Sequence, residues 1–183
     1  MAEILIVVGS ESGNARLVAE GVRDELQRLG HAATLAAGRD CADLNLEERG
    51  LLLVCTSTYG YGDWPDNIAP FAHSLDAVRP DLSRLRYGVI ALGDRTYADT
   101  FCLAGRRLDD ALRRLGALRL GERLEIDACA QPFPEEDALA WVKRWAPLIG
   151  GQPTHHNENN QHEENRQHEE IRRRRHHDPA RAV

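Results

Sequence analysis

The most informative segment of this chain is Gly9-Ser10-Glu11-Ser12-Gly13-Asn14-Ala15, which lies between an apolar run at residues 4–8 and a helical pattern that begins near Arg16. A strand that turns directly into a helix leaves the first N–H groups of the helix unpaired, and the helix dipole adds partial positive charge there. The segment therefore predicts an anion-binding loop. Ser, Gly and Asn also form ordinary turns and helix caps, so the loop alone does not establish a function.

Several other α/β classes lack support in this segment. The loop contains no Lys or Arg, as a nucleotide P-loop would, and its glycines do not have the Gly-x-Gly-x-x-Gly spacing. A low-molecular-weight phosphatase would need a nucleophilic Cys in this loop, and the loop has none. A response-regulator receiver would need a cluster of acids directly after the first strand, where Gly9 and Ser10 stand instead.

The rest of the sequence alternates between strand and helix patterns. Short apolar runs predict strands at residues 4–8, 32–36, 51–56, 87–92 and 118–128, and helical spacing predicts helices at residues 15–29, 65–75, 99–115 and 135–148. Continuous apolar runs are typical of strands buried on both faces, as in a parallel sheet. The pattern predicts a doubly wound α/β sandwich, in which ligands bind at the carboxyl ends of the strands.

Composition predicts a folded domain at residues 1–150 and a polar tail at residues 151–183. The tail is rich in His, Arg and Glu and nearly free of apolar residues, so we expect it to be disordered. The net charge of −6 falls on the domain, because the tail has six acids and six arginines. An acidic domain disfavours nucleic acid and anionic membranes as partners, and no apolar run approaches the about 18 residues of a membrane span. We therefore expect a cytoplasmic protein.

No metal site is expected, since the four cysteines are far apart in the sequence and form no Cys-x-x-Cys pair.

Unusual residues follow the third and fourth predicted strands. Residues 57–67 read Ser-Thr-Tyr-Gly-Tyr-Gly-Asp-Trp-Pro-Asp-Asn, and residues 91–102 read Ala-Leu-Gly-Asp-Arg-Thr-Tyr-Ala-Asp-Thr-Phe-Cys. Five of the ten aromatic residues lie in these two loops: Tyr59, Tyr61, Trp64, Tyr97 and Phe101. Stacking on a flat ring, worth about 0.5–1.5 kcal/mol per aromatic pair beyond area burial, would explain aromatic residues in surface loops.

Together with residues 9–15, these two loops resemble the three FMN-binding loops of the flavodoxin family, and the likeness covers residues 3 to about 148. Within the family, the chain is similar to short stand-alone flavodoxins of the MioC type and to the FMN domains of diflavin reductases. The resemblance implies a flavodoxin-like doubly wound three-layer sandwich with a five-stranded parallel sheet in the order 2-1-3-4-5. The segment at 118–128 is too short to contain the extra loop of long-chain flavodoxins.

The resemblance also implies a set of cofactor-binding residues for FMN. Residues 10–15 would bind the phosphate, Tyr59 and Tyr97 would flank the isoalloxazine, and the Gly60 carbonyl would accept a hydrogen bond from N5–H of the reduced ring. This sequence has Ser12 where the family commonly has Thr, and Tyr61 where relatives often have Glu or Ala. The implied set is Ser10, Glu11, Ser12, Gly13, Asn14, Ala15, Ser57, Thr58, Tyr59, Gly60, Tyr61, Gly62, Asp63, Leu92, Gly93, Asp94, Tyr97, Asp99, Phe101 and Cys102.

The resemblance implies an electron carrier and not an enzyme with a substrate of its own. It would shuttle single electrons from an NADPH-dependent reductase of the flavodoxin/ferredoxin–NADP reductase type to a metalloenzyme, with biotin synthase as one candidate, and would act as a monomer. An alternative is an FMN-binding accessory or regulatory protein that shuttles no electrons.

Five acids would surround the flavin, where negative charge lowers its potential and attracts a basic partner: Glu11, Asp63, Asp66, Asp94 and Asp99. Asp94 and Asp66 could instead cap turns or helices.

Overall fold

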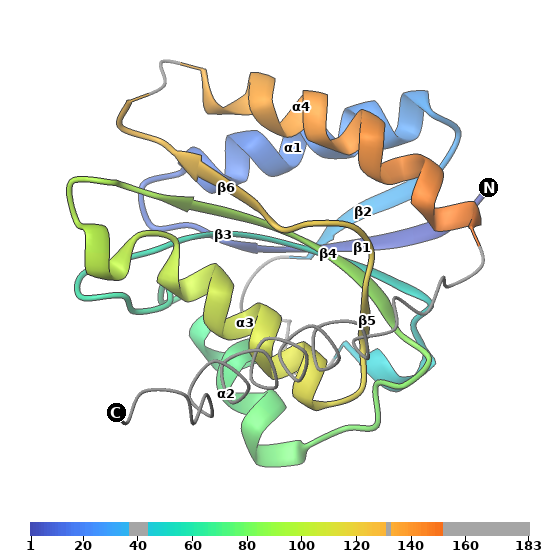
Figure 1. Ribbon diagram of the computed structural model, residues 1–183. Coiled ribbons are helices and arrows are strands. Elements are labelled where there is room, and N and C mark those ends of the chain that lie inside the picture. The colour runs from blue at the N-terminus through green and yellow to red at the C-terminus, as the bar shows by residue number, and fades with distance from the viewer. Residues whose placement is uncertain (37–43, 131–132, 152–183) are drawn as a thin grey trace, which may run out of the picture. The chain divides into compact units, whose positions relative to one another are not determined.

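A parallel sheet lies between two layers of helices in the computed structural model, which describes residues 1–36, 44–130 and 133–151 (Figure 1). The strand order is β2-β1-β3-β4-β5, and β6 also pairs with β4. This arrangement confirms the predicted flavodoxin-like class and strand order. The strands are β1 (Glu3–Gly9), β2 (Ala32–Ala36), β3 (Leu51–Ser57), β4 (Arg86–Gly93), β5 (Leu118–Arg119) and β6 (Leu124–Asp127).

The apolar runs form the central strands, as their composition predicts. Every residue from 4 to 9 in β1 and from 51 to 56 in β3 is buried, because both faces of the sheet are covered by helices. Neighbouring strands are parallel: Val8 pairs with Cys55, and Ser57 pairs with Leu92. The carboxyl ends of β1, β3 and β4 therefore lie together at one edge of the sheet.

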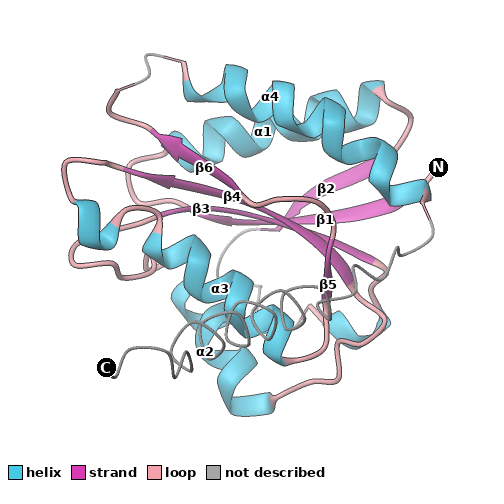
Figure 2. Cartoon of the chain, viewed as in Figure 1, coloured by secondary structure: helices cyan, strands magenta, loops and turns pink. Residues whose placement is uncertain are grey.

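Two helices cover each face of the sheet (Figures 1 and 2). Helices α1 (Asn14–Arg28) and α4 (Pro134–Trp145) pack on one face, and α2 (Ala69–Val78) and α3 (Leu103–Arg114) pack on the other. Short 3-10 helices are η2 (Leu46–Glu48), η3 (Ala98–Thr100) and η4 (Ala146–Gly150). In the described ranges, no helix has the length and apolar character that a membrane crossing requires.

The second predicted helix begins later than expected. We predicted a start at Pro65, but α2 begins at Ala69 and has Pro70 in its first turn. The Pro65 carbonyl accepts hydrogen bonds from the N–H groups of Ile68 and Ala69, which makes a separate turn before the helix. Pro70 has no N–H and would disrupt the interior of a helix that started at Pro65, whereas it fits a first turn.

The third predicted helix, at residues 99–115, is divided in two. Residues 98–100 form η3, and Cys102 adopts a left-handed conformation with φ 55° before α3 begins at Leu103. The Cys102 thiol turns inward and donates to the Ala91 carbonyl at 3.4 Å. The inward turn of Cys102 therefore separates η3 from α3.

The predicted fifth strand, at residues 118–128, is likewise two strands. Gly121, with φ 67°, lies between β5 and β6, and both strands pair with β4. The Glu122 carbonyl in this interruption accepts a hydrogen bond from the Trp141 indole of α4 at 3.0 Å.

A buried carboxylate on α3, that of Asp109, links the helix to β4 and to the segment that contains β5. Asp109 is fully buried, and its Oδ1 accepts a 2.6 Å hydrogen bond from the Tyr87 hydroxyl of β4. Arg119 and Arg123 both pair with its Oδ2. Burial and the Asp109 carboxylate raise the pKa of Tyr87 above its ordinary value, so the phenol stays protonated.

We expect Asp109→Ala to lower the free energy of unfolding by about 3 kcal/mol, because three donors would lose their shared acceptor. Urea unfolding of the variant measures this loss. The matched control is Asp110→Ala on the exposed side of the same helix, with an expected change below about 0.5 kcal/mol. Equal losses in the two variants would contradict a structural role specific to Asp109.

Candidate functional site

The loop between β1 and α1 is held in shape by hydrogen bonds within the loop and by hydrogen bonds to Asn67. The Ser10 N–H donates to Asn67 Oδ1 at 2.9 Å, and Asn67 Nδ2 donates to the Val8 carbonyl at 3.2 Å. Ser10 Oγ accepts from the Gly13 N–H at 3.0 Å, and Gly13 has φ 92°, a conformation that favours glycine. These contacts hold the loop in a curled shape at the end of β1.

The start of α1 leaves N–H groups available to a ligand. The first helical hydrogen bond joins the Leu17 N–H to the Gly13 carbonyl, so Asn14, Ala15 and Arg16 have no helical acceptor for theirs. No side chain caps this end, and the first turn of the helix contains no acid. The geometry suits an anion such as a phosphate group.

The loop after β3 forms a tight turn at residues 59–63. The Tyr59 N–H donates to the Asp63 carbonyl at 3.0 Å, and the Asp63 N–H donates back to the Tyr59 carbonyl at 2.8 Å. Gly60 and Gly62 have φ of 54° and 99°, which other residues rarely adopt. The turn leaves the Tyr59 and Tyr61 side chains exposed.

The loop after β4 is held by Asp94. Its Oδ1 accepts hydrogen bonds from the Thr96 N–H at 2.8 Å and the Thr96 hydroxyl at 2.6 Å. These bonds hold the pKa of Asp94 below its ordinary value, so the carboxylate remains charged. The turn-capping alternative is thus observed for Asp94, and the same side chain also lines the pocket described next.

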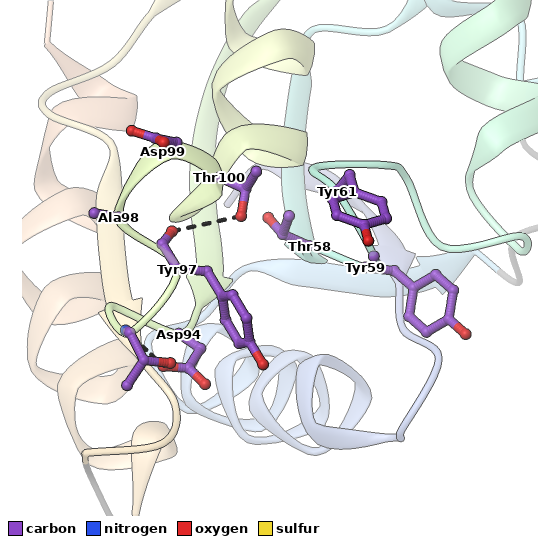
Figure 3. Close-up of a pocket in the computed structure, with 10 residues that line it drawn as sticks. Thr58, Tyr59, Tyr61, Asp94, Tyr97, Ala98, Asp99 and Thr100 are labelled. Carbon is purple, nitrogen blue, oxygen red and sulfur yellow. Dashed lines mark hydrogen bonds between the residues drawn. The ribbon is translucent and has the colours of Figure 1, made fainter.

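An open pocket of about 860 Å³ lies between the second and third loops. Figure 3 shows Tyr97 on one side of it and Tyr59 and Tyr61 on the other. Tyr97 is 67% exposed and Tyr59 58% exposed, so their ring faces are available for stacking. The lining residues are Thr58, Tyr59, Gly60, Tyr61, Asp94, Thr96, Tyr97, Ala98, Asp99 and Thr100.

The structure divides the implied cofactor-binding set into three groups. Seven residues line the pocket: Thr58, Tyr59, Gly60, Tyr61, Asp94, Tyr97 and Asp99. Residues 10–13 form the adjoining loop, and Asn14 and the buried Ala15 begin α1. Gly62 and Asp63 lie in the second loop, and Ser57 and Gly93 are the last residues of β3 and β4; none of these four lines the pocket. Leu92, Phe101 and Cys102 are buried beneath the site.

The prediction that aromatic residues in these loops stack on a flat ring is wrong for two of the five, Phe101 and Trp64. Phe101 is 7% exposed, with the guanidinium groups of Arg95 and Arg106 4.8 and 5.8 Å from its ring centroid. Trp64 packs against the α2–α3 core and donates to the Ala104 carbonyl at 3.1 Å. Both rings therefore have a packing reason to be in these loops, and stacking stays a prediction for the exposed Tyr59, Tyr61 and Tyr97.

Sequence reasoning missed several contributors to the site. Asn67 lies in the second loop, but only the fold shows that it reaches the first loop. Thr96, Ala98 and Thr100 line the pocket, and the first and last are small polar residues typical of turns. A fourth loop follows β6, where the Ala128 N–H donates to the Gly93 carbonyl at 2.9 Å.

The fold and these loops define a doubly wound α/β protein with an uncapped helix N-terminus that suits an anion and a pocket lined by tyrosines at the carboxyl edge of its sheet. The chain belongs to the flavodoxin family, whose model matches residues 6–141. This membership confirms the resemblance inferred from the three loops. Flavodoxins are FMN-binding electron-transfer proteins, and FMN is accordingly the cofactor of this chain.

Individual relatives agree with the family assignment. Protein MioC of Escherichia coli (strain K12) is 39% identical over 149 residues, which are 81% of this chain and 99% of that protein. Flavodoxin YqcA of the same strain is 42% identical over 149 residues, with the same two coverages. A solved structure of a flavodoxin variant from Pseudomonas aeruginosa has a TM-score of 0.75 and 32% identity, covering 81% of this chain and 99% of that one.

The residues present fit FMN in size and in chemistry. A pocket of about 860 Å³ lies within the roughly 300–1,000 Å³ of small-molecule sites. The uncapped N-terminus of α1 suits the phosphate, and the exposed faces of Tyr59 and Tyr97 suit a flat ring.

We expect Tyr97→Ala to weaken FMN binding about tenfold, because one stacking face worth up to about 1.5 kcal/mol would be lost. Titration of the cofactor-free protein with FMN, followed by flavin fluorescence, gives the dissociation constant. The control is Phe133→Ala, an exposed aromatic residue that does not line the pocket. An unchanged affinity in the Tyr97 variant would remove Tyr97 from the site.

Proposed function

We propose that this chain carries single electrons from an NADPH-dependent flavin reductase to a metalloenzyme, with biotin synthase as one candidate acceptor. The observation that carries the proposal is the exposure of the pocket, whose three tyrosines, Tyr59, Tyr97 and Tyr61, are 58%, 67% and 92% exposed. A ring held there would keep an edge within reach of a partner protein. When bound, FMN supplies the one-electron chemistry that the amino acid side chains lack.

The proposed placement of FMN uses all three loops. Residues 10–15 would hold the phosphate, because the N–H groups of Asn14, Ala15 and Arg16 have no helical acceptor. Tyr59 and Tyr97 would flank the ring. The Gly60 carbonyl would accept a hydrogen bond from N5–H, and the glycine allows the peptide to reorient without the steric cost of a side chain.

In this proposal, acidic side chains make the site negatively charged. Asp94 and Asp99 line the pocket, and Glu11, Asp63 and Asp66 are exposed on the adjoining loops. The lowered pKa of Asp94 keeps its charge as the pH falls toward the acid range. Negative charge next to the ring opposes the addition of electrons and attracts a basic partner surface.

The three described cysteines are not activated as nucleophiles. Burial raises the pKa of Cys55 and of Cys102 to about 12. A hydrogen bond to the Asp94 carboxylate raises the pKa of Cys129. Each of these three residues is therefore held as a thiol, which is a weak nucleophile.

We also propose that residues 1–150 are the FMN-binding domain and that residues 151–183 are a separate tail. Met1–Gly150 form one compact unit, which supports the boundary.

We expect a chain ending at Gly151 to bind FMN with the same dissociation constant as the full chain, because the loops and the residues that hold them lie before Gly151. A loss of FMN affinity on truncation, measured by the same titration, would contradict this boundary.

We expect Asp63→Asn together with Asp66→Asn to slow reduction by NADPH and a flavodoxin reductase about fivefold at low ionic strength, with the difference fading as salt screens the charges. Stopped-flow absorbance at several salt concentrations measures the rate. The control pair is Asp24→Asn with Asp76→Asn, two exposed carboxylates on α1 and α2. A loss of rate that does not depend on salt would point to structural damage, and a wild-type protein that is not reduced would favour the accessory role.

A further inference from the structure

The turn at residues 59–63 has little packing of its own. Its tip, Gly60 and Tyr61, is exposed, with Tyr61 92% accessible to solvent. Two hydrogen bonds converge on the Tyr59 carbonyl, from the N–H groups of Gly62 at 3.1 Å and Asp63 at 2.8 Å. Since two glycines make the backbone of this turn permissive, its conformation depends on contacts from outside it.

The beginning of α3 holds both ends of this loop. The Ala104 N–H donates to Thr58 Oγ1 at 3.2 Å, on the side before the turn. The Ala104 carbonyl accepts from the Trp64 indole at 3.1 Å, on the side after it. A Cβ at Gly62 would lie 2.5 Å from Leu103 Cδ2, so the Gly62 backbone packs directly on this helix.

A charged side chain of α3 also reaches the turn. Arg107 follows Ala104 by three residues and so lies on the same face of the helix. Its Nη1 donates to the Gly62 carbonyl at 3.1 Å. The guanidinium carries a positive charge, which makes this a charge-assisted hydrogen bond.

The Arg107 contact falls on the peptide group that closes the turn. The Gly62 carbonyl and the Asp63 N–H belong to one peptide, and that N–H donates to the Tyr59 carbonyl. A donor on the carbonyl polarises the peptide and strengthens the bond that its N–H makes. The Gly60 carbonyl, in contrast, accepts no hydrogen bond from the described residues. The Gly62–Asp63 peptide is therefore hydrogen-bonded through both its carbonyl and its N–H, which sets it apart from the Gly60–Tyr61 peptide.

We propose that Arg107 is a positioning residue for the flavin site, which holds the Gly62–Asp63 peptide so that only the peptide after Gly60 reorients when the cofactor changes its redox state. The second half of this statement rests on the proposed electron-carrier function. The first half concerns the protein alone. Arg107 acts through the turn and does not line the pocket.

The direct test is amide hydrogen exchange in the cofactor-free full-length chain. We expect Arg107→Gln to speed exchange of the Gly62 and Asp63 N–H groups about tenfold, because both donate to the Tyr59 carbonyl across the base of the turn. Arg107→Lys, which keeps a charged donor, should restore most of the protection. The control is Arg114→Gln, two turns further along α3, where the arginine pairs with Asp76 at the surface. Unchanged exchange in Arg107→Gln, or equal changes in the control, would overturn the proposal.

A second readout uses the FMN-loaded protein. We expect Arg107→Gln to change the separation between the two one-electron midpoint potentials, while Arg114→Gln leaves it unchanged. A shift in exchange without a shift in potentials would contradict the redox part of the proposal. If the wild-type protein bound no FMN, the proposed function would fail, and the exchange experiment would still decide whether Arg107 holds the turn.

Discussion

The site depends on the parallel register of three adjacent strands. Because Gly9 pairs with Thr56 and Ser57 pairs with Leu92, β1, β3 and β4 end at the same edge of the sheet. Segments separated by about forty residues in the sequence therefore become neighbours. Burial of both faces of these strands keeps that edge fixed, since a slip of one residue would exchange side chains between the two buried faces and disrupt the packing of both core layers.

The loops at this edge satisfy most of their own polar groups and direct what remains toward a ligand. Asn67 hydrogen-bonds to the first loop, Ala104 and Arg107 hydrogen-bond to the second, and Asp94 accepts hydrogen bonds within the third. The N–H groups at the start of α1 and the faces of Tyr59 and Tyr97 are left available. The hydrogen bonds therefore fix the shape of the loops, and the groups left available are free to contact FMN in an open pocket.

Much of this could be predicted from the sequence, because continuous apolar runs have few alternatives to a buried parallel strand. The errors came from tertiary contacts that override local pattern. Cys102 turns inward toward the Ala91 carbonyl and breaks the expected helix, and Gly121 breaks the expected strand. Phe101 looked like a ring for stacking, but two arginines and the core enclose it. Long-range contacts such as Arg107 with Gly62 leave no local signal.

Binding of FMN by the three loops, in a form that transfers single electrons, is tested most directly by the visible absorption of the purified chain during titration with FMN, followed by stepwise reduction at controlled potential. We expect saturable binding of one FMN per chain and two separable one-electron steps. An absence of binding with excess FMN would contradict the site, and reduction in a single two-electron step would contradict the carrier function.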